Sequence, residues 1–296
     1  MELDIEEKSL VVYKALASDV RLSIIRLLSK NKMSVQNIAS ALNLSSTIIL
    51  MHLNKLAEAQ IITFEKKGHN KIAKIKVDNI NIHFPIEIYS ELEHYDVEIP
   101  IGQYTDFSVK PTCGLAGKNN YIGKVDEPPY FMDPGRIDAG MIWWNEGFLE
   151  YQLPNYVEKN KKVEMIELSM ELGSEFPFSN NVWLSDITFY VNNVKLGTWT
   201  SPGDFSDTRG IYTPRWVPDN VNQYGILKNI RLTSEGCYLD GKPLSNIKLS
   251  DIMNDEATVV FKVSIDEDSI NNGGCTIFGK GFGNHDQGIN MKLFYE

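Results

Sequence analysis

The chain has little cysteine: three residues in 296, at Cys113, Cys237 and Cys275, with no Cys-x-x-Cys spacing. A set this sparse and odd in number excludes a disulfide scaffold and a thiolate zinc site, and it favours a reduced, cytoplasmic compartment. Apolar runs of the roughly 18 residues needed to span a bilayer are also missing, so no membrane-spanning helix is predicted. The N-terminal residues are acidic and lack the basic segment of a secretory signal.

Basic residues are scarce over most of the chain and concentrated in one segment. Residues 8–77 contain 12 Lys and Arg against three acidic residues, whereas the rest of the chain contains 17 against 36. A hydrophobic content of 43% and a charged content of 23% are ordinary for a globular protein, and 296 residues allow two domains. The charge distribution therefore predicts two modules, of which the basic one suits a phosphate-bearing partner.

Residues 1–78 are predicted to form a winged helix-turn-helix domain. Four helical segments come first, and three serines are N-cap candidates for the last three of them: Ser18, Ser34 and Ser45. A β-hairpin with a polar turn follows over residues 61–77. This order of helices and hairpin is typical of domains that place one helix in the major groove and the hairpin near flanking phosphates.

Residues 15–62 contain three motifs in order: LASDVRLSIIRLL, SVQNIASALNLS and HLNKLAEAQII. Together they resemble the arsenic-repressor (ArsR) family of bacterial regulators, over roughly the first quarter of the chain. The resemblance implies a homodimer that binds double-stranded DNA at a palindromic operator.

The predicted DNA contacts lie on the helix that follows Ser45 and on the hairpin: Ser46, Thr47, Met51, His52, Lys55, Lys66, Lys67, His69, Lys71 and Lys74. One departure from the family pattern is that Ile48, Leu50 and Met51 stand where hydrogen-bonding residues are usual. Apolar side chains contact thymine methyl groups but make none of the bidentate contacts that carry most base discrimination. The alternative left open is that this apolar face packs against another domain or protomer.

Neither metal-sensing pattern of the family is expected, and no cofactor is predicted. Residues 34–42, the segment that holds thiolate ligands in many family members, contain no Cys or His. Ten residues lie between His83 and His94, as in a second family site, but Asn81 and Val97 stand where that site has acidic ligands. Both histidines are therefore predicted to be surface or core residues.

The rest of the chain is predicted to be a connector over residues 79–104 and an antiparallel β-sandwich over residues 105–296, which makes the fold class α+β and multidomain. Apolar and polar residues alternate in many short segments, as in residues 166–172. Asn192-Asn193 and Asp240-Gly241 are two-residue hairpin signals. Such a pattern indicates a jelly roll. The domain looks similar to the C-terminal extensions of some ArsR-like regulators and, in outline, to carbohydrate-binding modules.

A ligand site is predicted where aromatic and cationic residues gather around a Pro/Gly-rich loop: Trp199, Arg209, Tyr212, Arg215 and Trp216. Flat aromatic faces beside planar hydrogen-bonding groups suit sugar rings, so a saccharide is the first ligand candidate. The competing explanation is that the tryptophans are core residues, since sandwiches routinely bury Trp between their sheets.

The sequence contains no catalytic constellation, and an enzyme is not expected. Glu167 and Glu171 share a strand face, but they lie about 13 Å apart at 3.3 Å per residue. A glycosidase pair needs a separation of roughly 5–9.5 Å. A Gly-x-Ser-x-Gly nucleophile elbow is also missing.

The sequence therefore predicts a cytoplasmic, dimeric transcriptional regulator in which a small ligand of the sandwich shifts operator affinity. Its expected partners are operator DNA, a second copy of the chain and the ligand, and no membrane. The alternative is an assembly or carbohydrate-binding protein that does not bind DNA and uses the winged helix for dimerisation.

Overall fold

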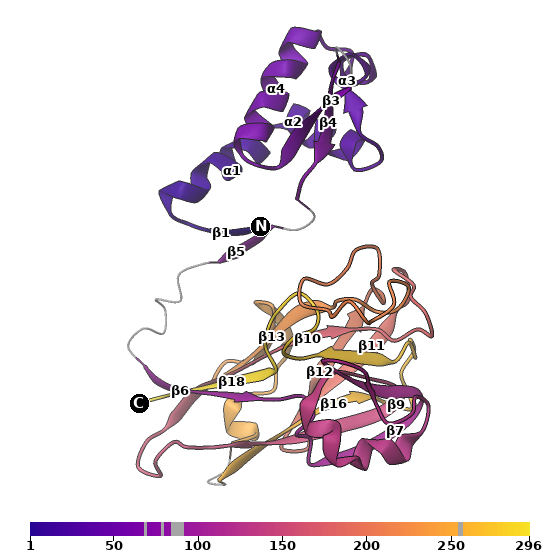
Figure 1. Cartoon of the computed structure of the whole chain (residues 1–296). Helices are drawn as coiled ribbons and strands as arrows, with labels where there is room; N and C mark the ends of the chain where they lie inside the picture. Colours follow the sequence, from indigo (N-terminus) through magenta and orange to yellow (C-terminus); the bar gives the residue numbers. More distant parts are fainter. Residues whose placement is uncertain (68–69, 78–79, 84–91, 254–256) are drawn as a thin grey trace. The chain divides into compact units, whose positions relative to one another are not determined.

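The computed structural model describes residues 1–67, 70–77, 80–83, 92–253 and 257–296 of the chain (Figure 1). They form two compact units, Met1–Glu91 and Leu92–Glu296, each with its own hydrophobic core. Within the described ranges, no helix is long and apolar enough to cross a membrane.

The first unit is a winged helix-turn-helix domain. Its described elements are β1 (Glu2–Asp4), η1 (Glu7–Ser9), α1 (Leu10–Leu16), α2 (Asp19–Leu28), β2 (Met33–Ser34), α3 (Val35–Leu42), α4 (Ser46–Glu58), β3 (Ile62–Lys67), β4 (Asn70–Ile75) and β5 (Asn81–His83). Strands β2, β4 and β3 form an antiparallel sheet in that order, and β1 and β5 form a separate parallel pair. The predicted helices followed by a hairpin are thus confirmed.

Local capping determines where the helices of the helix-turn-helix begin and end. Ser34 Oγ accepts a hydrogen bond from Asn37 N (3.2 Å), and Ser45 Oγ accepts one from Ile48 N (3.3 Å). Ser18 precedes α2 in extended conformation, but its side chain makes no cap hydrogen bond, so that part of the capping prediction is wrong.

The turns around these helices depend on two other residues. Asn43 ends α3 in the left-handed region (φ 53°), a conformation that Asn tolerates, and so makes the tight turn into α4. Arg21 of α2 is buried because its guanidinium donates hydrogen bonds to Ala15 O (2.5 Å) and Lys14 O (2.7 Å) at the C-terminal end of α1. These bonds satisfy helix carbonyls that otherwise lack partners and hold α2 against α1.

The second unit is an antiparallel β-sandwich of jelly-roll type. Its elements are β6 (Glu93–Ile99), β7 (Asp106–Gly117), β8 (Tyr121–Ile122), η3 (Pro128–Met132), η4 (Pro134–Asp138), β9 (Ala139–Pro154), β10 (Val163–Gly173), β11 (Ser185–Val191), β12 (Val194–Ser201), β13 (Ile226–Thr233), β14 (Cys237–Leu239), β15 (Lys242–Ser245), η5 (Leu249–Asp251), β16 (Thr258–Ile265), β17 (Cys275–Phe278) and β18 (Ile289–Tyr295).

Strands β9 and β10 each pair with three other strands and organise this unit (Figure 1). Strand β9 pairs with β7, β16 and β17, whereas β10 pairs with β13, β17 and β18. Strand β17 therefore joins the two groups of strands. Trp144, Tyr151, Phe189 and Phe261 are fully buried in the core of this unit.

Alternation and turn chemistry explain the strands, as predicted. Along β10 the apolar positions Ile166, Leu168, Met170 and Leu172 are all buried. Asn192-Asn193 and Asp240-Gly241 adopt positive φ in the β11–β12 and β14–β15 turns, as two-residue hairpins of this kind require.

The predicted connector over residues 79–104 extends too far toward the C-terminus. Strand β6 falls inside it and pairs along its whole length with β18, from Ile99 opposite Ile289 to Glu93 opposite Tyr295. These backbone hydrogen bonds place residues 93–99 in the sandwich. Residues 78–79 and 84–91 of the expected connector region lie outside the described residues.

Candidate functional site

The candidate nucleic-acid interface of the first unit surrounds the start of α4. Ser46 and Thr47 are exposed there, and they line a hollow of about 390 Å³ together with Gln36 of α3 and Lys71 of β4. The first backbone N–H groups of a helix have no intrahelical acceptor, and its dipole is positive at that end. Because the N-terminal ends of both α3 and α4 border this hollow, it suits a phosphate group.

Farther along α4 the predicted contacts differ in character. Lys55 is exposed, whereas His52 is half-buried and its Nδ1 has no hydrogen-bond partner among the described residues. Burial lowers the pKa of His52, and the charges of Arg21 and Lys55 lower it further. At neutral pH the imidazole is therefore an uncharged hydrogen-bonding group rather than a phosphate-binding cation.

The apolar positions of α4 are exposed within this unit. Ile48 is 42% exposed and Met51 is 48% exposed, and Leu50 is half-buried at the rim of the hollow. Packing within the first unit therefore does not account for these apolar side chains on α4. Both interpretations stay predictions: contact with thymine methyl groups, or contact with a protein surface.

The lysines of the hairpin are not equivalent. Lys74 Nζ lies 2.5 Å from Glu65 Oε1, and Lys32 Nζ lies 3.1 Å from Glu65 Oε2, so one carboxylate compensates two cations. Lys71 is exposed and its Nζ lies 5.5 Å from the ring centre of Phe64. Three further predicted contacts have side chains outside the described part of the chain: Lys66, Lys67 and His69.

In the second unit, the sequence suggested that Trp199 lies beside a loop, but the structure places it in a strand. It lies within β12 opposite Ile187 of β11, and Lys228 Nζ lies 4.5 Å from its ring centre. The expectation was wrong because β12 continues to Ser201. The indole also packs against the sandwich core, as the competing explanation for the tryptophans required.

The other four predicted ligand residues do share one loop, but two of them are engaged within the protein. Arg209 donates hydrogen bonds to Pro214 O (2.8 Å) and Val217 O (3.0 Å) and pairs with Asp219. Trp216 Nε1 donates to Lys118 O (2.8 Å). The remaining two are exposed, and their role as ligand contacts stays a prediction: Tyr212 and Arg215.

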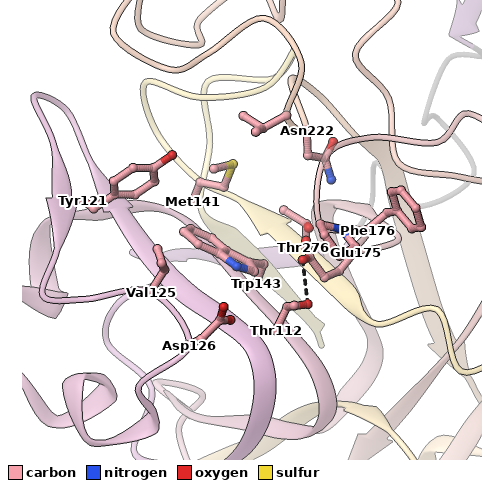
Figure 2. A pocket seen from close by; sticks show the side chains of 12 residues that line it. Thr112, Tyr121, Val125, Asp126, Met141, Trp143, Glu175, Phe176, Asn222 and Thr276 are labelled. Carbon is pink, nitrogen blue, oxygen red and sulfur yellow. Dashed lines mark hydrogen bonds between the residues drawn. The ribbon is translucent and has the colours of Figure 1, made fainter.

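A cavity of about 210 Å³ lies beside this loop, which contributes Val221 and Asn222 to its lining (Figure 2). Its lining includes three aromatic side chains, two carboxylates and a carboxamide: Tyr121, Trp143, Phe176, Asp126, Glu175 and Asn222. Figure 2 shows these side chains arranged around one space, with Trp143 in the middle of the wall.

The position of Trp143 follows from strand geometry. Trp143 and Trp144 are successive residues of β9, so their side chains point to opposite faces. Trp144 is buried in the core, and Trp143 lines the cavity. Gly114 of β7 pairs with Trp143, and a Cβ at Gly114 would lie 2.3 Å from the indole. Glycine is therefore what allows the ring to lie across the neighbouring strand.

Two acidic side chains line the cavity, of which Glu175 is buried and Asp126 is exposed. Glu175 is 8% exposed and accepts a hydrogen bond from Thr112 Oγ1 (2.8 Å). Burial raises the pKa of Glu175 to about 8, and the charges of Asp204 and Asp126 add to the rise. Asp126 itself accepts a hydrogen bond from Cys113 N (2.9 Å).

Two buried polar atoms in or behind this wall have no hydrogen-bond partner among the described residues. Asp204 is fully buried; one carboxylate oxygen accepts a hydrogen bond from Phe176 N (3.0 Å), and the other accepts none among the described residues. Burial raises the pKa of Asp204 to about 8. Asn222 donates to Ser174 O (3.0 Å), but its Oδ1 likewise has no partner in the described part of the chain.

Little in the sequence pointed to this cavity, because its residues come from separate strands and loops, although the predicted ligand residue Trp216 packs against its wall at Tyr121. A further signal was the Trp143-Trp144 pair, since two successive Trp on a strand place one indole outside the core that holds the other. Three or more His, Cys, Asp or Glu gathered as metal ligands are not found among the described residues.

Comparisons with known proteins agree with this description of the first unit. Residues 18–63 match the family model described as "Bacterial regulatory protein, arsR family". Among solved structures, HlyU from Vibrio cholerae is similar at 27% identity over 25% of this chain and 84% of that chain, with a TM-score of 0.24. A homodimeric winged helix-turn-helix domain from Mycobacterium bovis, described as a possible ArsR-family transcriptional regulator, is similar at 28% identity. The match covers 23% of this chain and 64% of that chain, with a TM-score of 0.23.

The second unit has a more distant likeness. The CBM36-1 domain of a multidomain xylanase from the hindgut metagenome of Trinervitermes trinervoides is 8% identical over 68% of this chain and 96% of that chain, with a TM-score of 0.29. A search of curated proteins returns no match. The chain thus contains an ArsR-family helix-turn-helix domain, at residues 18–63, followed by a β-sandwich.

Proposed function

We propose that the protein is a cytoplasmic transcriptional regulator that binds operator DNA as a homodimer and senses a small ligand through its sandwich. The observation that carries the DNA-binding part is the hollow at the start of α4, where two helix N-termini, Ser46, Thr47 and Lys71 meet. The excess of basic residues over residues 8–77 extends the positive potential around it. In the proposed complex, α4 lies in the major groove and the hairpin contacts flanking phosphates.

Replacing Lys71 by Ala is expected to weaken binding to operator DNA roughly 3- to 10-fold and to lower the salt slope by about one phosphate contact. The reason is that Lys71 is exposed beside the two helix N-termini. The measurement is fluorescence anisotropy with DNA from upstream of the protein's own gene, at several salt concentrations.

Lys74→Ala is the matched control, because Lys74 lies on the same strand but is compensated by Glu65. It should change both quantities less than Lys71→Ala does. A scrambled duplex of the same length provides the second control. Equal, weak binding of the unaltered protein to both duplexes would reject the regulator.

The proposed homodimer is supported by exposed apolar side chains at the start of the first unit. Leu10 and Val11 of α1 are 43% and 39% exposed, and Ile5 just before them is 54% exposed. Exposed apolar residues gathered in one segment mark protein contact surfaces more often than chance surface positions do.

Val11→Glu is therefore expected to shift the protein from dimer to monomer, because a buried, unpaired carboxylate in the interface would be costly. Analytical ultracentrifugation at micromolar concentration measures the change. Ile270→Glu, which alters a side chain 94% exposed in the second unit, should leave the assembly state unchanged. Dimers of equal stability in both variants would place the interface elsewhere.

The ligand-sensing part of the proposal is supported by the cavity of the sandwich. Its aromatic wall and hydrogen-bonding groups are the combination that binds saccharides, which makes a compact sugar the proposed ligand class. A ligand that binds one dimer arrangement better than the other shifts the population of the two and changes operator affinity. A coupling of about 1–3 kcal/mol would change that affinity roughly 5- to 150-fold.

A second candidate function is an assembly or carbohydrate-binding protein that does not bind DNA. The exposure of Ile48 and Met51 on α4 favours it, because these side chains occupy the face that would read bases. It predicts that Met51→Glu disrupts self-association while Lys71→Ala has no effect on any property of the protein. We propose no enzymatic activity for either unit.

A further inference from the structure

The aromatic wall of the cavity is held rigid by neighbouring rings. Tyr121 lies edge-on to Trp143, with ring centres 6.0 Å apart, and edge-on to Trp216 at 4.9 Å. Phe176 lies edge-on to Trp183 at 4.8 Å. Rings fixed in this way present their faces and edges to a ligand without further loss of side-chain freedom on binding.

The charge of the cavity is of one sign. Asp126 and Glu175 line it, Asp204 lies behind Glu175 near enough to raise its pKa, and no Lys, Arg or His is among its described lining residues. Asp126 is exposed, whereas the carboxyl groups of Glu175 and Asp204 are buried and keep their protons up to about pH 8 because no counter-charge lies beside them. A neutral ligand leaves this unchanged. A cation compensates the carboxyl groups and is also attracted by the faces of Trp and Tyr, of which Trp is the stronger partner.

The lining distinguishes an organic cation from a metal ion. Calcium takes six to eight oxygen ligands, and magnesium demands a near-ideal octahedron. The cavity offers two carboxylates, with no third metal-ligating side chain grouped with them in the described residues, and three of its lining side chains are aromatic. An ammonium group attached to carbon needs only a carboxylate or two and an aromatic face.

The size and polarity of the cavity narrow the class of ligand further. The cavity volume of about 210 Å³ is below the range of about 300–1,000 Å³ found for drug-sized ligands, so one small ring is the appropriate size. Thr112, Thr276 and Asn222 add hydroxyl and amide groups to the lining, and Asn222 Oδ1 has no partner among the described residues. These groups suit a ligand with several hydroxyls.

We propose that the cavity binds a compact, protonated amino sugar, with its ammonium group between Asp126 and Glu175 and its ring against Trp143. This inference rests on the proposed function, because it names the ligand class of the same sensing site. The hydroxyls of the sugar bond to the polar lining, and the C–H face of the ring packs on the indole.

Isothermal titration calorimetry of the full chain at pH 6, where a primary amine is protonated, tests the proposal with three probes. D-glucosamine carries the ammonium group, D-glucose lacks it, and N-acetyl-D-glucosamine has the same nitrogen without charge. Glucosamine is expected to bind at least tenfold more tightly than either of the others. N-acetyl-D-glucosamine and D-glucose should bind with similar affinity.

Two isosteric variants test whether the carboxylate of Asp126 binds the ammonium group. Asp126→Asn keeps an oxygen to accept the hydrogen bond from Cys113 N, yet it should remove most of the preference for glucosamine. Glu146→Gln is the matched control, since Glu146 lies on β9 outside the cavity lining and pairs with Lys110, and it should retain the full preference. A thermal melt of each variant confirms that it is folded.

The results separate this inference from the proposed function. Equal binding of glucose and glucosamine would overturn the assignment of a cationic ligand and leave a sugar site. Binding of none of the three sugars, with operator binding intact in the same samples, would overturn the assignment of this cavity. Preference for glucosamine that persists in Asp126→Asn would place the ammonium site elsewhere. Absence of operator binding, by contrast, would contradict the regulator whatever the sugars do.

Discussion

Replacing Glu171 by Leu is expected to lower the free energy of unfolding of the sandwich by about 3–5 kcal/mol. The carboxylate is fully buried and accepts hydrogen bonds from three backbone groups: Gly225 N at 2.8 Å, Asn284 N at 2.9 Å and His285 N at 2.8 Å. Leucine removes every acceptor and leaves the buried N–H of Gly225 and the partly buried N–H groups of Asn284 and His285 without this partner. Each such donor costs about 1–3 kcal/mol, and partial relaxation of the loop lowers the sum.

Glu171 matters because it fastens two loops to the end of β10. The carboxylate connects the segment around Asn284 to the residue that precedes β13, Gly225. Gly283 packs so closely that a Cβ there would lie 2.5 Å from Glu171 Oε1. The loop between β17 and β18 is therefore expected to lose protection from hydrogen exchange in Glu171→Leu before the sandwich unfolds globally.

Chemical denaturation monitored by tryptophan fluorescence measures the loss for the sandwich. Glu93→Leu is the matched control: Glu93 pairs with Lys161 at the surface, and its side chain is 66% exposed. An exposed pair of this kind contributes about 0–1 kcal/mol, so the control should be nearly as stable as the unaltered protein. Similar losses in the two variants would show that the buried hydrogen bonds of Glu171 do not stabilise the fold.

The sandwich is expected to become less stable as pH rises from about 5 to about 8. In the folded chain the pKa of Glu175 and that of Asp204 are both raised to about 8, mainly by burial, from ordinary values of 4.5 and 3.8. Between the ordinary and the raised pKa, the folded state holds protons that the unfolded state has released. The free energy of unfolding therefore falls with increasing pH through this window, by an amount on the order of a few kcal/mol.

Acidic groups with lowered pKa make the sandwich less stable at low pH. Asp186 accepts hydrogen bonds from Thr200 Oγ1 (2.7 Å) and Asn271 N (3.0 Å), and these bonds outweigh burial and lower its pKa. Its contribution is present above the unfolded value of about 3.8 and is lost as pH falls through the folded value. Stability of the sandwich should therefore be greatest near pH 4–5, on the acid side of the range usual for proteins.

Melting temperature measured from pH 4 to pH 9 tests this prediction. The double variant Glu175→Gln/Asp204→Asn keeps the side-chain shapes and removes both titrating groups, so its profile should be flatter above pH 5. A control variant, Glu146→Gln, should keep the slope of the unaltered protein. A melting temperature that rises from pH 5 to pH 8 in the unaltered protein would contradict the raised pKa values of both acids.

Much of the fold could be predicted from the sequence because its signals are local. A serine before a helix supplies a hydrogen-bond acceptor three residues away, which is why Ser34 and Ser45 marked helix starts. Alternation along β10 identified its core face, and Asn192-Asn193 marked a hairpin through the positive φ that asparagine tolerates. In each case the interacting groups are within a few residues of one another.

The sequence alone therefore determined the class of the first unit, the antiparallel sandwich of the second and the contrast in charge between them. Which polar residues are buried, and which residues meet at a site, depends on how the distant strands and loops pack. Glu171 lies on the outer face of β10 by alternation, yet a loop more than a hundred residues later covers it. Arg209 donates hydrogen bonds to carbonyl groups of its own loop. The cavity brings together Thr112, Trp143 and Glu175 from three separate strands or loops. Burial and pKa depend on these distant neighbours, and periodicity along one strand contains no information about what covers its other face.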